Sequence, residues 1–95
     1  MFVLLIKYVK PSEEVDRLLK EHIHYLEKYY QQGKFICSGR RNPRTGGVIL
    51  ANADTEAEIK EIISEDPFLV NKVGEYEIVE FTPTKYRAEF ASFVK

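Results

Sequence analysis

The most constraining feature of the sequence is a long segment whose apolar residues recur at three- and four-residue spacing. This spacing is typical of a helix with one buried face. The helix is expected to begin at Ser12, acting as N-cap before acidic residues that the helix dipole favours, and to end at Gly33. The residues that share its inward face are Val15, Leu18, Leu19, His22, Leu26 and Tyr29.

Four short segments around this helix have the composition of β-strands. They run over residues 2–8, 34–38, 48–51 and about 76–81, and the second and third are joined as a hairpin by the loop over residues 40–45. A second helix is expected to begin at Thr55, with Glu58 completing a capping box, and to end at Asp66 because Pro67 follows.

This order of elements, βαββαβ, predicts an α+β fold of the ferredoxin-like kind. Right-handed crossovers convert it into a four-stranded antiparallel sheet with two helices on one face. The 95 residues suit a single domain over residues 1–95, with residues 84–95 as a C-terminal tail.

Two of the strands are apolar without alternation, over residues 3–6 and 48–50. A sheet with one wet face alternates apolar and polar residues, so both faces of this sheet are expected to be buried. The helices cover only one face, and we therefore expect a homodimer through the open sheet face. Tyr86, Phe90 and Phe93 of the tail are candidates for extra cover.

Composition excludes several classes of function. The 14 Lys and Arg residues balance 15 Asp and Glu residues, so neither nucleic acid nor an anionic membrane surface is an expected partner. No apolar run approaches the roughly 20 residues that span a bilayer. Cys37 has no partner for an intramolecular disulfide and is expected on a buried strand, and no signal peptide is apparent, so a cytoplasmic location is expected.

His22 is the first candidate for chemistry, because its imidazole can exchange a proton near neutral pH. Two interpretations are open: an acid–base residue, or a core histidine that donates to one backbone carbonyl. Asp66 is the second candidate, either as a carboxylate that orients an imidazole or acts as a base, or as part of an ordinary Asp-Pro turn. His24 is expected to be solvated.

The end of the second strand is the third candidate. Ser38, Gly39 and Arg40 combine a hydroxyl, a small residue and a guanidinium group where a ligand carboxylate could bind, and the alternative is a solvated hairpin. Two histidines and one distant cysteine do not make a metal site, and phosphate-binding glycine loops and nucleophile elbows are lacking. We therefore expect no metal or other cofactor.

Several of these motifs together resemble the YciI-like (YCII-related) family. They are His22 followed by Gly33, the segment Lys34-Phe35-Ile36-Cys37-Ser38-Gly39, and Asp66-Pro67-Phe68; the similarity runs over residues 2–82. The resemblance implies a dimeric α/β barrel with an active-site pair that maps onto His22 and Asp66. Many members have Gly-Pro where this chain has Gly39-Arg40, so its pocket rim differs in shape and charge.

The hypothesis at this point is a small-molecule enzyme that uses His22 and Asp66 as an acid–base pair on a small cyclic or aromatic metabolite. Hydrolase, dehalogenase and isomerase chemistry all fit it, with Ser38, Gly39 and Arg40 binding the substrate. The alternative is a non-catalytic metabolite-binding or accessory dimeric module. Because His22 lies about 15 Å along the helix from Ser12, contact with Asp66 requires an oblique helix or an inward fold of the chain after Pro67.

Overall fold

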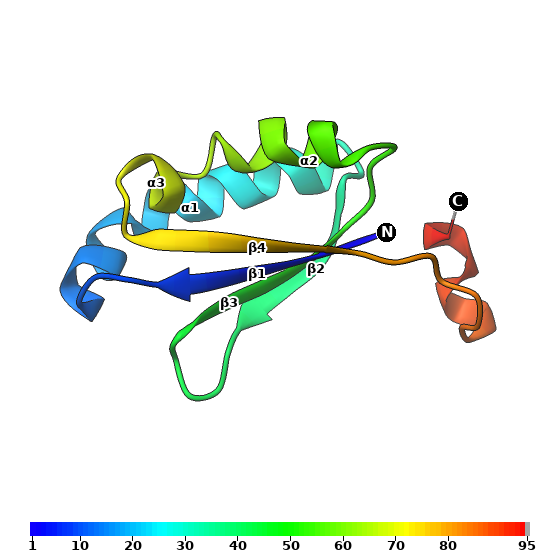
Figure 1. The fold of residues 1–95 in the computed structure, drawn as a ribbon, viewed down its shortest axis with the longest axis horizontal. Helices are drawn as coiled ribbons and strands as arrows, with labels where there is room; N and C mark the ends of the chain where they lie inside the picture. The colour runs from blue at the N-terminus through cyan, green and yellow to red at the C-terminus, as the bar shows by residue number, and fades with distance from the viewer. Residues whose placement is uncertain (95) are drawn as a thin grey trace.

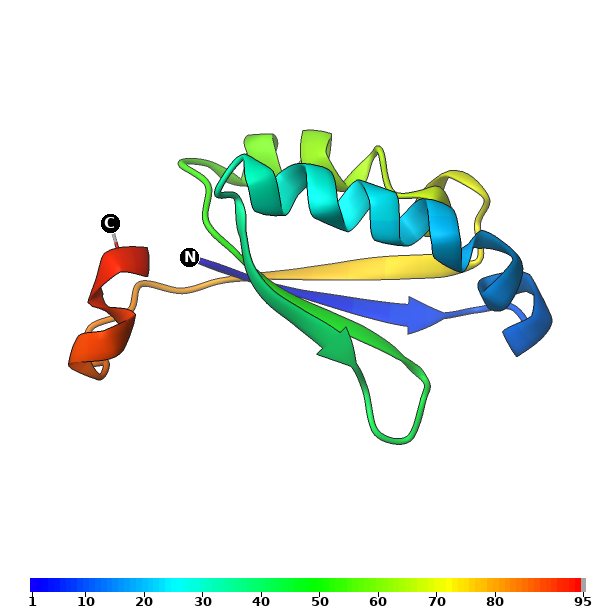
Figure 2. The same ribbon diagram turned by 180° about the vertical axis from the view of Figure 1, so that it is seen from behind.

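Four antiparallel strands in the order β2-β3-β1-β4 form the base of the fold. The computed structural model describes residues 1–94. The strands are β1 (Phe2–Tyr8), β2 (Phe35–Arg40), β3 (Gly46–Ala51) and β4 (Gly74–Glu80). The helices are α1 (Ser12–Gln31), α2 (Glu56–Ile63) and the short α3 (Pro67–Val70), and all lie on one face of the sheet (Figures 1 and 2). The predicted α+β ferredoxin-like fold is confirmed, with α3 as an addition.

The first helix begins differently from the prediction and ends as expected. Its N-cap is Pro11 and no side chain caps it, so Ser12 is the first helical residue. At the other end Gly33 adopts a φ of 71°, and the N–H of Lys34 donates to the carbonyl of Tyr29 over 2.9 Å. Glycine is favoured there because a side chain disfavours positive φ.

The inward face of α1 differs from the prediction at its flank. Leu19 is exposed and Leu26 is only partly buried, whereas Tyr25 lies in the core. The buried residues of the helix are Val15, Leu18, His22, Tyr25 and Tyr29. The core therefore follows a narrower stripe of the helix, and the two leucines line a cavity beside it.

The chain after α2 corrects the prediction for Asp66. Thr55 caps α2 by accepting the N–H of Glu58 over 3.1 Å, and Glu58 accepts the N–H of Asp54 over 3.0 Å. The helix ends at Ile63, and Asp66 is the N-cap of α3. Pro67 needs no hydrogen bond in a first helical turn, so the Asp-Pro pair begins a helix here.

The open face of the sheet is apolar at its centre. Phe2, Leu4 and Ile6 point toward the helices and are buried. The alternate residues on the other face, Val3, Leu5, Val48 and Leu50, are only partly buried in the single chain. Cys37 is exposed, contrary to the prediction, because it pairs with Leu50 on this uncovered face of the edge strand.

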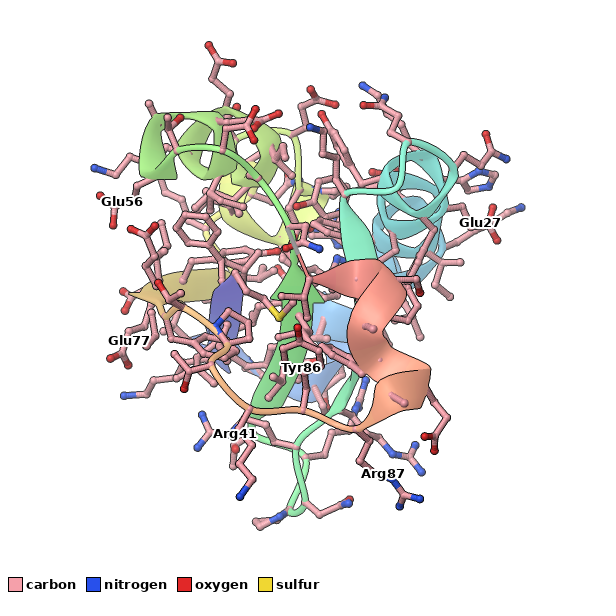
Figure 3. All side chains as sticks on the ribbon, turned by 90° about the vertical axis from the view of Figure 1, so that its right-hand side faces the viewer. Glu27, Arg41, Glu56, Glu77, Tyr86 and Arg87 are labelled. Carbon is pink, nitrogen blue, oxygen red and sulfur yellow. The ribbon has the colours of Figure 1, made fainter. Side chains whose placement is uncertain are left out.

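The tail extends past the end of the sheet and ends in a 3-10 helix, Ala88–Phe93 (Figures 1 and 2). Asn52 Nδ2 donates to the backbone carbonyl of Phe93 and ties the tail to the domain. Figure 3 looks onto this end, where Tyr86 is 47% exposed. The tail aromatics thus lie beyond the sheet end and do not cover its open face. Within residues 1–94 no helix combines the length and hydropathy needed to cross a membrane.

Candidate active site

His22 and Asp66 are in direct contact in the interior. Nδ1 of His22 lies 2.8 Å from Oδ1 of Asp66, and the two residues are 8% and 0% exposed. Carboxylate oxygens accept hydrogen bonds, so the imidazole donates from Nδ1 and its Nε2 is left for a ligand. The chain after Pro67 folds inward and packs α3 against α1, which brings Asp66 to the middle of the helix.

Two further donors hold the carboxylate of Asp66. The N–H of Phe68 donates to Oδ1 over 2.9 Å, and the hydroxyl of Tyr76 donates to Oδ2 over 2.5 Å. Burial, followed by the neighbouring Tyr25 and Asp66, raises the pKa of Tyr76 far above its ordinary value, so its hydroxyl stays protonated. Each oxygen of a fully buried carboxylate therefore has a partner, as burial of a charge requires.

The residue before Asp66 also fixes the linker to α1. Glu65 accepts hydrogen bonds from Lys28 Nζ and from the Tyr29 hydroxyl, and each has a donor–acceptor distance of 2.6 Å. These two donors lower the pKa of Glu65. Two successive carboxylates, Glu65 and Asp66, thus bind side chains at separate positions along α1. These contacts fix the position of α3 relative to α1.

Aromatic packing fixes the plane of the imidazole. Its ring stacks on Phe68 with centroids 4.1 Å apart and an interplanar angle of 11°. The ring of Tyr25 lies on another side of the imidazole, with the two ring centroids 5.9 Å apart. The imidazole is therefore held by one hydrogen bond and one stacked ring, which is the pre-organisation that proton transfer needs.

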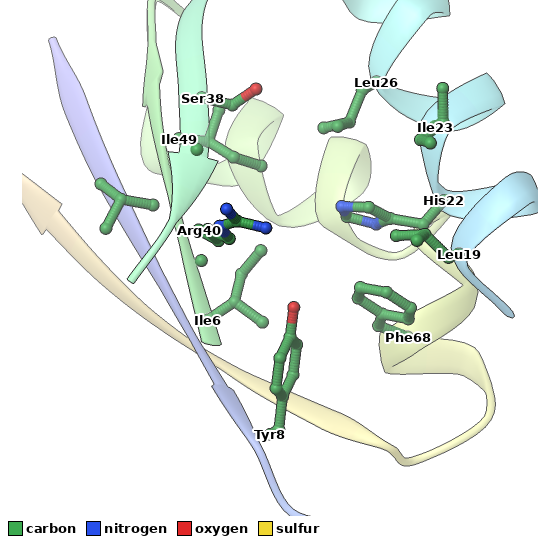
Figure 4. Close-up of a pocket in the computed structure, with 13 residues that line it drawn as sticks. Ile6, Tyr8, Leu19, His22, Ile23, Leu26, Ser38, Arg40, Ile49 and Phe68 are labelled. Atoms are coloured by element: carbon green, nitrogen blue, oxygen red, sulfur yellow. The ribbon is translucent and has the colours of Figure 1, made fainter. Parts of the chain in front are cut away.

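A cavity of about 180 Å³ opens beside His22, between α1 and the β2 edge of the sheet. Figure 4 shows the imidazole directed across it toward Arg40, with the Tyr8 hydroxyl pointing in from below. Apolar side chains form most of its wall: Ile6, Leu19, Ile23, Leu26, Ile49 and Phe68. The polar side chains at the wall are few, as is usual for a small-molecule site, and come from β1, α1 and β2.

A bulge in β2 decides which side chains of that strand face the cavity. Phe35 pairs with Ala51 but Cys37 pairs with Leu50, so Ile36 is an extra residue. Ser38 and Arg40 consequently share the helix-covered face with Ile49 and Gly47. Without the extra residue the alternation from Phe35 would turn both side chains to the open face.

The predicted binding residues all line the cavity, in different ways. Arg40 forms no ion pair with any residue of the described chain and is exposed. The hydroxyl of Ser38 is hydrogen-bonded to that of Tyr30 at a distance of 2.5 Å. Gly39 has no side chain and lines the cavity with its backbone, and a Cβ at this position would meet nothing within 4 Å. Residues 1–94 contain no cluster of His, Cys, Asp or Glu suited to a metal ion.

Sequence reasoning missed Tyr8 and Tyr76. Both occupy even-numbered strand positions, on the same sheet face as Ile6, so alternation alone marks them as pointing toward the helices. The hydroxyl groups at these inward positions could have marked both residues as candidates for the site, because a buried polar atom needs a hydrogen-bond partner.

A solved structure has a similar fold. It is that of 5-chloro-2-hydroxyhydroquinone dehydrochlorinase from Burkholderia phenoliruptrix AC1100, in complex with 2,5-dihydroxybenzoquinone, and it matches this chain with a TM-score of 0.67. The identity is 18%, and the match covers 85% of this chain and 93% of that one. No curated protein matches the sequence significantly. The family model of the YCII-related domain matches residues 1–85, and the chain therefore belongs to the YCII-related family.

Proposed function

We propose that the protein is a small-molecule enzyme in which His22 and Asp66 transfer protons to and from a small cyclic or aromatic metabolite. The observation that carries this proposal is the buried 2.8 Å contact between His22 Nδ1 and Asp66 Oδ1 at the wall of a cavity. A buried carboxylate bonded to one imidazole nitrogen leaves the other as an acid–base group of fixed direction.

The mechanism follows from this arrangement. Nε2 of His22 takes a proton from the substrate or from a water molecule, and Asp66 stabilises the imidazolium that forms. The proton is then returned to the product or leaving group. The apolar wall limits water around the reacting atoms and strengthens these interactions. Hydrolytic dehalogenation, lactone hydrolysis and isomerisation all require such a group.

The size of the cavity supports a substrate with a single ring. Its volume of about 180 Å³ is close to the roughly 150 Å³ of an apolar cavity that admits benzene, and below the roughly 300–1,000 Å³ of sites for drug-sized ligands. The dehydrochlorinase of similar fold is named for a chlorinated hydroxyhydroquinone, and we include that compound class among the candidate substrates.

The test compares three reactions with wild type, His22→Gln and His24→Gln. The assays are chloride release from 5-chloro-2-hydroxyhydroquinone, exchange of ring C–H for deuterium in hydroxyhydroquinone, and hydrolysis of a small lactone. His24 is an exposed histidine on the same helix, which makes it the matched control.

We expect wild type to accelerate at least one reaction and His22→Gln to lose about 10²–10⁴-fold of that rate, with His24→Gln unchanged. Turnover that survives His22→Gln would contradict the acid–base role. Metabolite binding without turnover in any assay, unchanged by His22→Ala, would instead support the binding module.

We also propose that the protein is a homodimer through the open sheet face. Val3, Leu5, Val48 and Leu50 form its centre, and Val79 of β4 extends it beside Val3. This contiguous apolar surface is uncovered in the single chain, and a second copy would bury it.

A further inference from the structure

Tyr8 is a pocket residue that the proposed acid–base pair does not use. It ends β1 and lines the same cavity as His22 and Arg40, with its hydroxyl directed inward (Figure 4). That hydroxyl forms no hydrogen bond with any residue of the described chain. A half-buried phenol with an unused donor at a cavity wall is suited to bind a ligand oxygen.

The ring of Tyr8 is held from two sides. Phe68 contacts it edge-on, with centroids 5.8 Å apart and an interplanar angle of 85°. The guanidinium of Arg44 lies 5.9 Å from the ring centroid and is itself bound to Asp16 over 2.6 Å. The hydroxyl therefore has a fixed position, so a ligand that accepts its hydrogen bond loses little to ordering the side chain.

The hydroxyl of Tyr8 keeps its proton at neutral pH and can therefore donate a hydrogen bond. Burial raises the pKa of Tyr8 above its ordinary value, although Arg44 opposes the shift. A protonated phenol beside a cation recognises an acceptor that carries negative charge.

Arg40 supplies that cation from β2, which is separated from β1 by β3. Arg40 pairs with Gly47, and Gly47 pairs with Ile6, so these three positions form one row on the helix-covered face. Gly47 lies between Arg40 and Ile6 in this row, and Arg40, Gly47, Ile6 and Tyr8 all line the same cavity. Arg40 is a permanent donor without an acidic partner in the described chain.

We propose that Tyr8 and Arg40 form an oxyanion-binding subsite that selects ring compounds bearing an ionised oxygen and holds that oxygen opposite His22. This inference rests on the proposed function and names its substrate class. The oxygen belongs to a carboxylate or to a phenolate or enolate, which present the same charged acceptor. Bound this way, the ring lies between the subsite and Nε2 of His22, where a proton can be moved at another ring position.

The test measures ligand binding, so it does not depend on turnover. Isothermal titration calorimetry is carried out at pH 7 with benzoate and its neutral isostere benzamide, and with ionised 2,5-dihydroxybenzoquinone and neutral hydroquinone. The proteins are wild type, Tyr8→Phe and Arg40→Gln, with Tyr86→Phe and Arg41→Gln as controls outside this cavity. Tyr8→Phe keeps the ring that Phe68 and Arg44 contact.

Wild type is expected to bind at least one anion about tenfold more tightly than the neutral compound paired with it. Each of Tyr8→Phe and Arg40→Gln should reduce that preference about five- to tenfold, while both controls keep it. The preferred anion identifies the oxygen as carboxylate or phenolate.

The subsite would be overturned by equal affinity of wild type for the anions and their paired neutral compounds, by a preference unchanged in Tyr8→Phe, or by no binding of either anion at millimolar concentration. An anion preference that persists in a protein without His22-dependent turnover would retain the subsite and reject the enzyme, so the two failures are distinguishable.

Discussion

Tyr76 and Arg40 stand at opposite ends of one row across the sheet. Tyr76 pairs with Ile6, Ile6 with Gly47, and Gly47 with Arg40, and opposite residues in antiparallel pairs share a face. At one end Tyr76 donates to Asp66, and at the other Arg40 lines the cavity. One row of paired residues therefore positions two groups: the Tyr76 hydroxyl, which holds Asp66 beside His22, and the Arg40 guanidinium, which carries the positive charge of the cavity.

Replacing Tyr76 with phenylalanine should destabilise the protein by about 1–3 kcal/mol, because a buried carboxylate oxygen loses its donor. Urea denaturation measures the free energy of unfolding. Tyr86→Phe is the matched control, since Tyr86 is exposed and should change the free energy little. Equal stability of Tyr76→Phe and wild type would show that the hydroxyl does not support Asp66.

Glu65→Gln should reduce stability near neutral pH and have less effect in acid. The pKa of Glu65 is lowered by Lys28 and Tyr29, so its stabilising contribution is present above the unfolded value of about 4.3 and is lost as pH falls through the lower folded value. Melting temperatures of wild type and variant, measured from pH 7 to pH 3, should converge as the pH falls below the unfolded value of about 4.3. Glu61→Gln, at an exposed position of α2, serves as the control. A gap that widens in acid would contradict this assignment.

The periodic parts of the fold could be predicted from the sequence, because helix and strand periods are local properties. The strand over residues 2–8, the end of α1 at Gly33 and the sheet with its helices on one face follow from them. The N-terminus of α1 was misassigned because Ser12 suits an N-cap, but Pro11 occupies that position.

The candidate site depends on features that a local pattern does not contain. Asp-Pro is compatible with the end of one helix or the start of another, and only packing against α1 decides between them. The position of Arg40 depends on the bulge at Ile36, which is a property of strand pairing. The family resemblance named His22 and Asp66 as a pair, and their catalytic roles stay predictions.

Gly46→Ala should destabilise the protein by more than about 3 kcal/mol. A Cβ at Gly46 would lie 1.7 Å from the backbone oxygen of Ile6, so the strands would have to separate. Gly39→Ala, where a Cβ meets nothing within 4 Å, is the matched control and should stay within about 0.5 kcal/mol of wild type. Chemical denaturation of both variants decides; similar midpoints would disprove the close approach of β3 to β1.

Leu50→Lys should convert the proposed dimer into a monomer, because it places a charge at the centre of the open sheet face. Light scattering should then report a mass near 11.1 kDa in place of twice that value. Val70→Lys introduces the same charge at a position on α3 that is 63% exposed, and should leave the dimer intact. A monomeric wild type would contradict the proposed interface.

The most direct test of the acid–base proposal is the position of the proton on the neutral imidazole of His22. Nitrogen-15 NMR of the imidazole side chains distinguishes the two tautomers, and His24 provides an exposed reference in the same spectrum. The contact with Asp66 predicts that His22 carries its proton on Nδ1, with Nε2 unprotonated and available at the cavity. A proton on Nε2 in the wild-type protein would contradict the account, because Asp66 would then not orient the imidazole for catalysis.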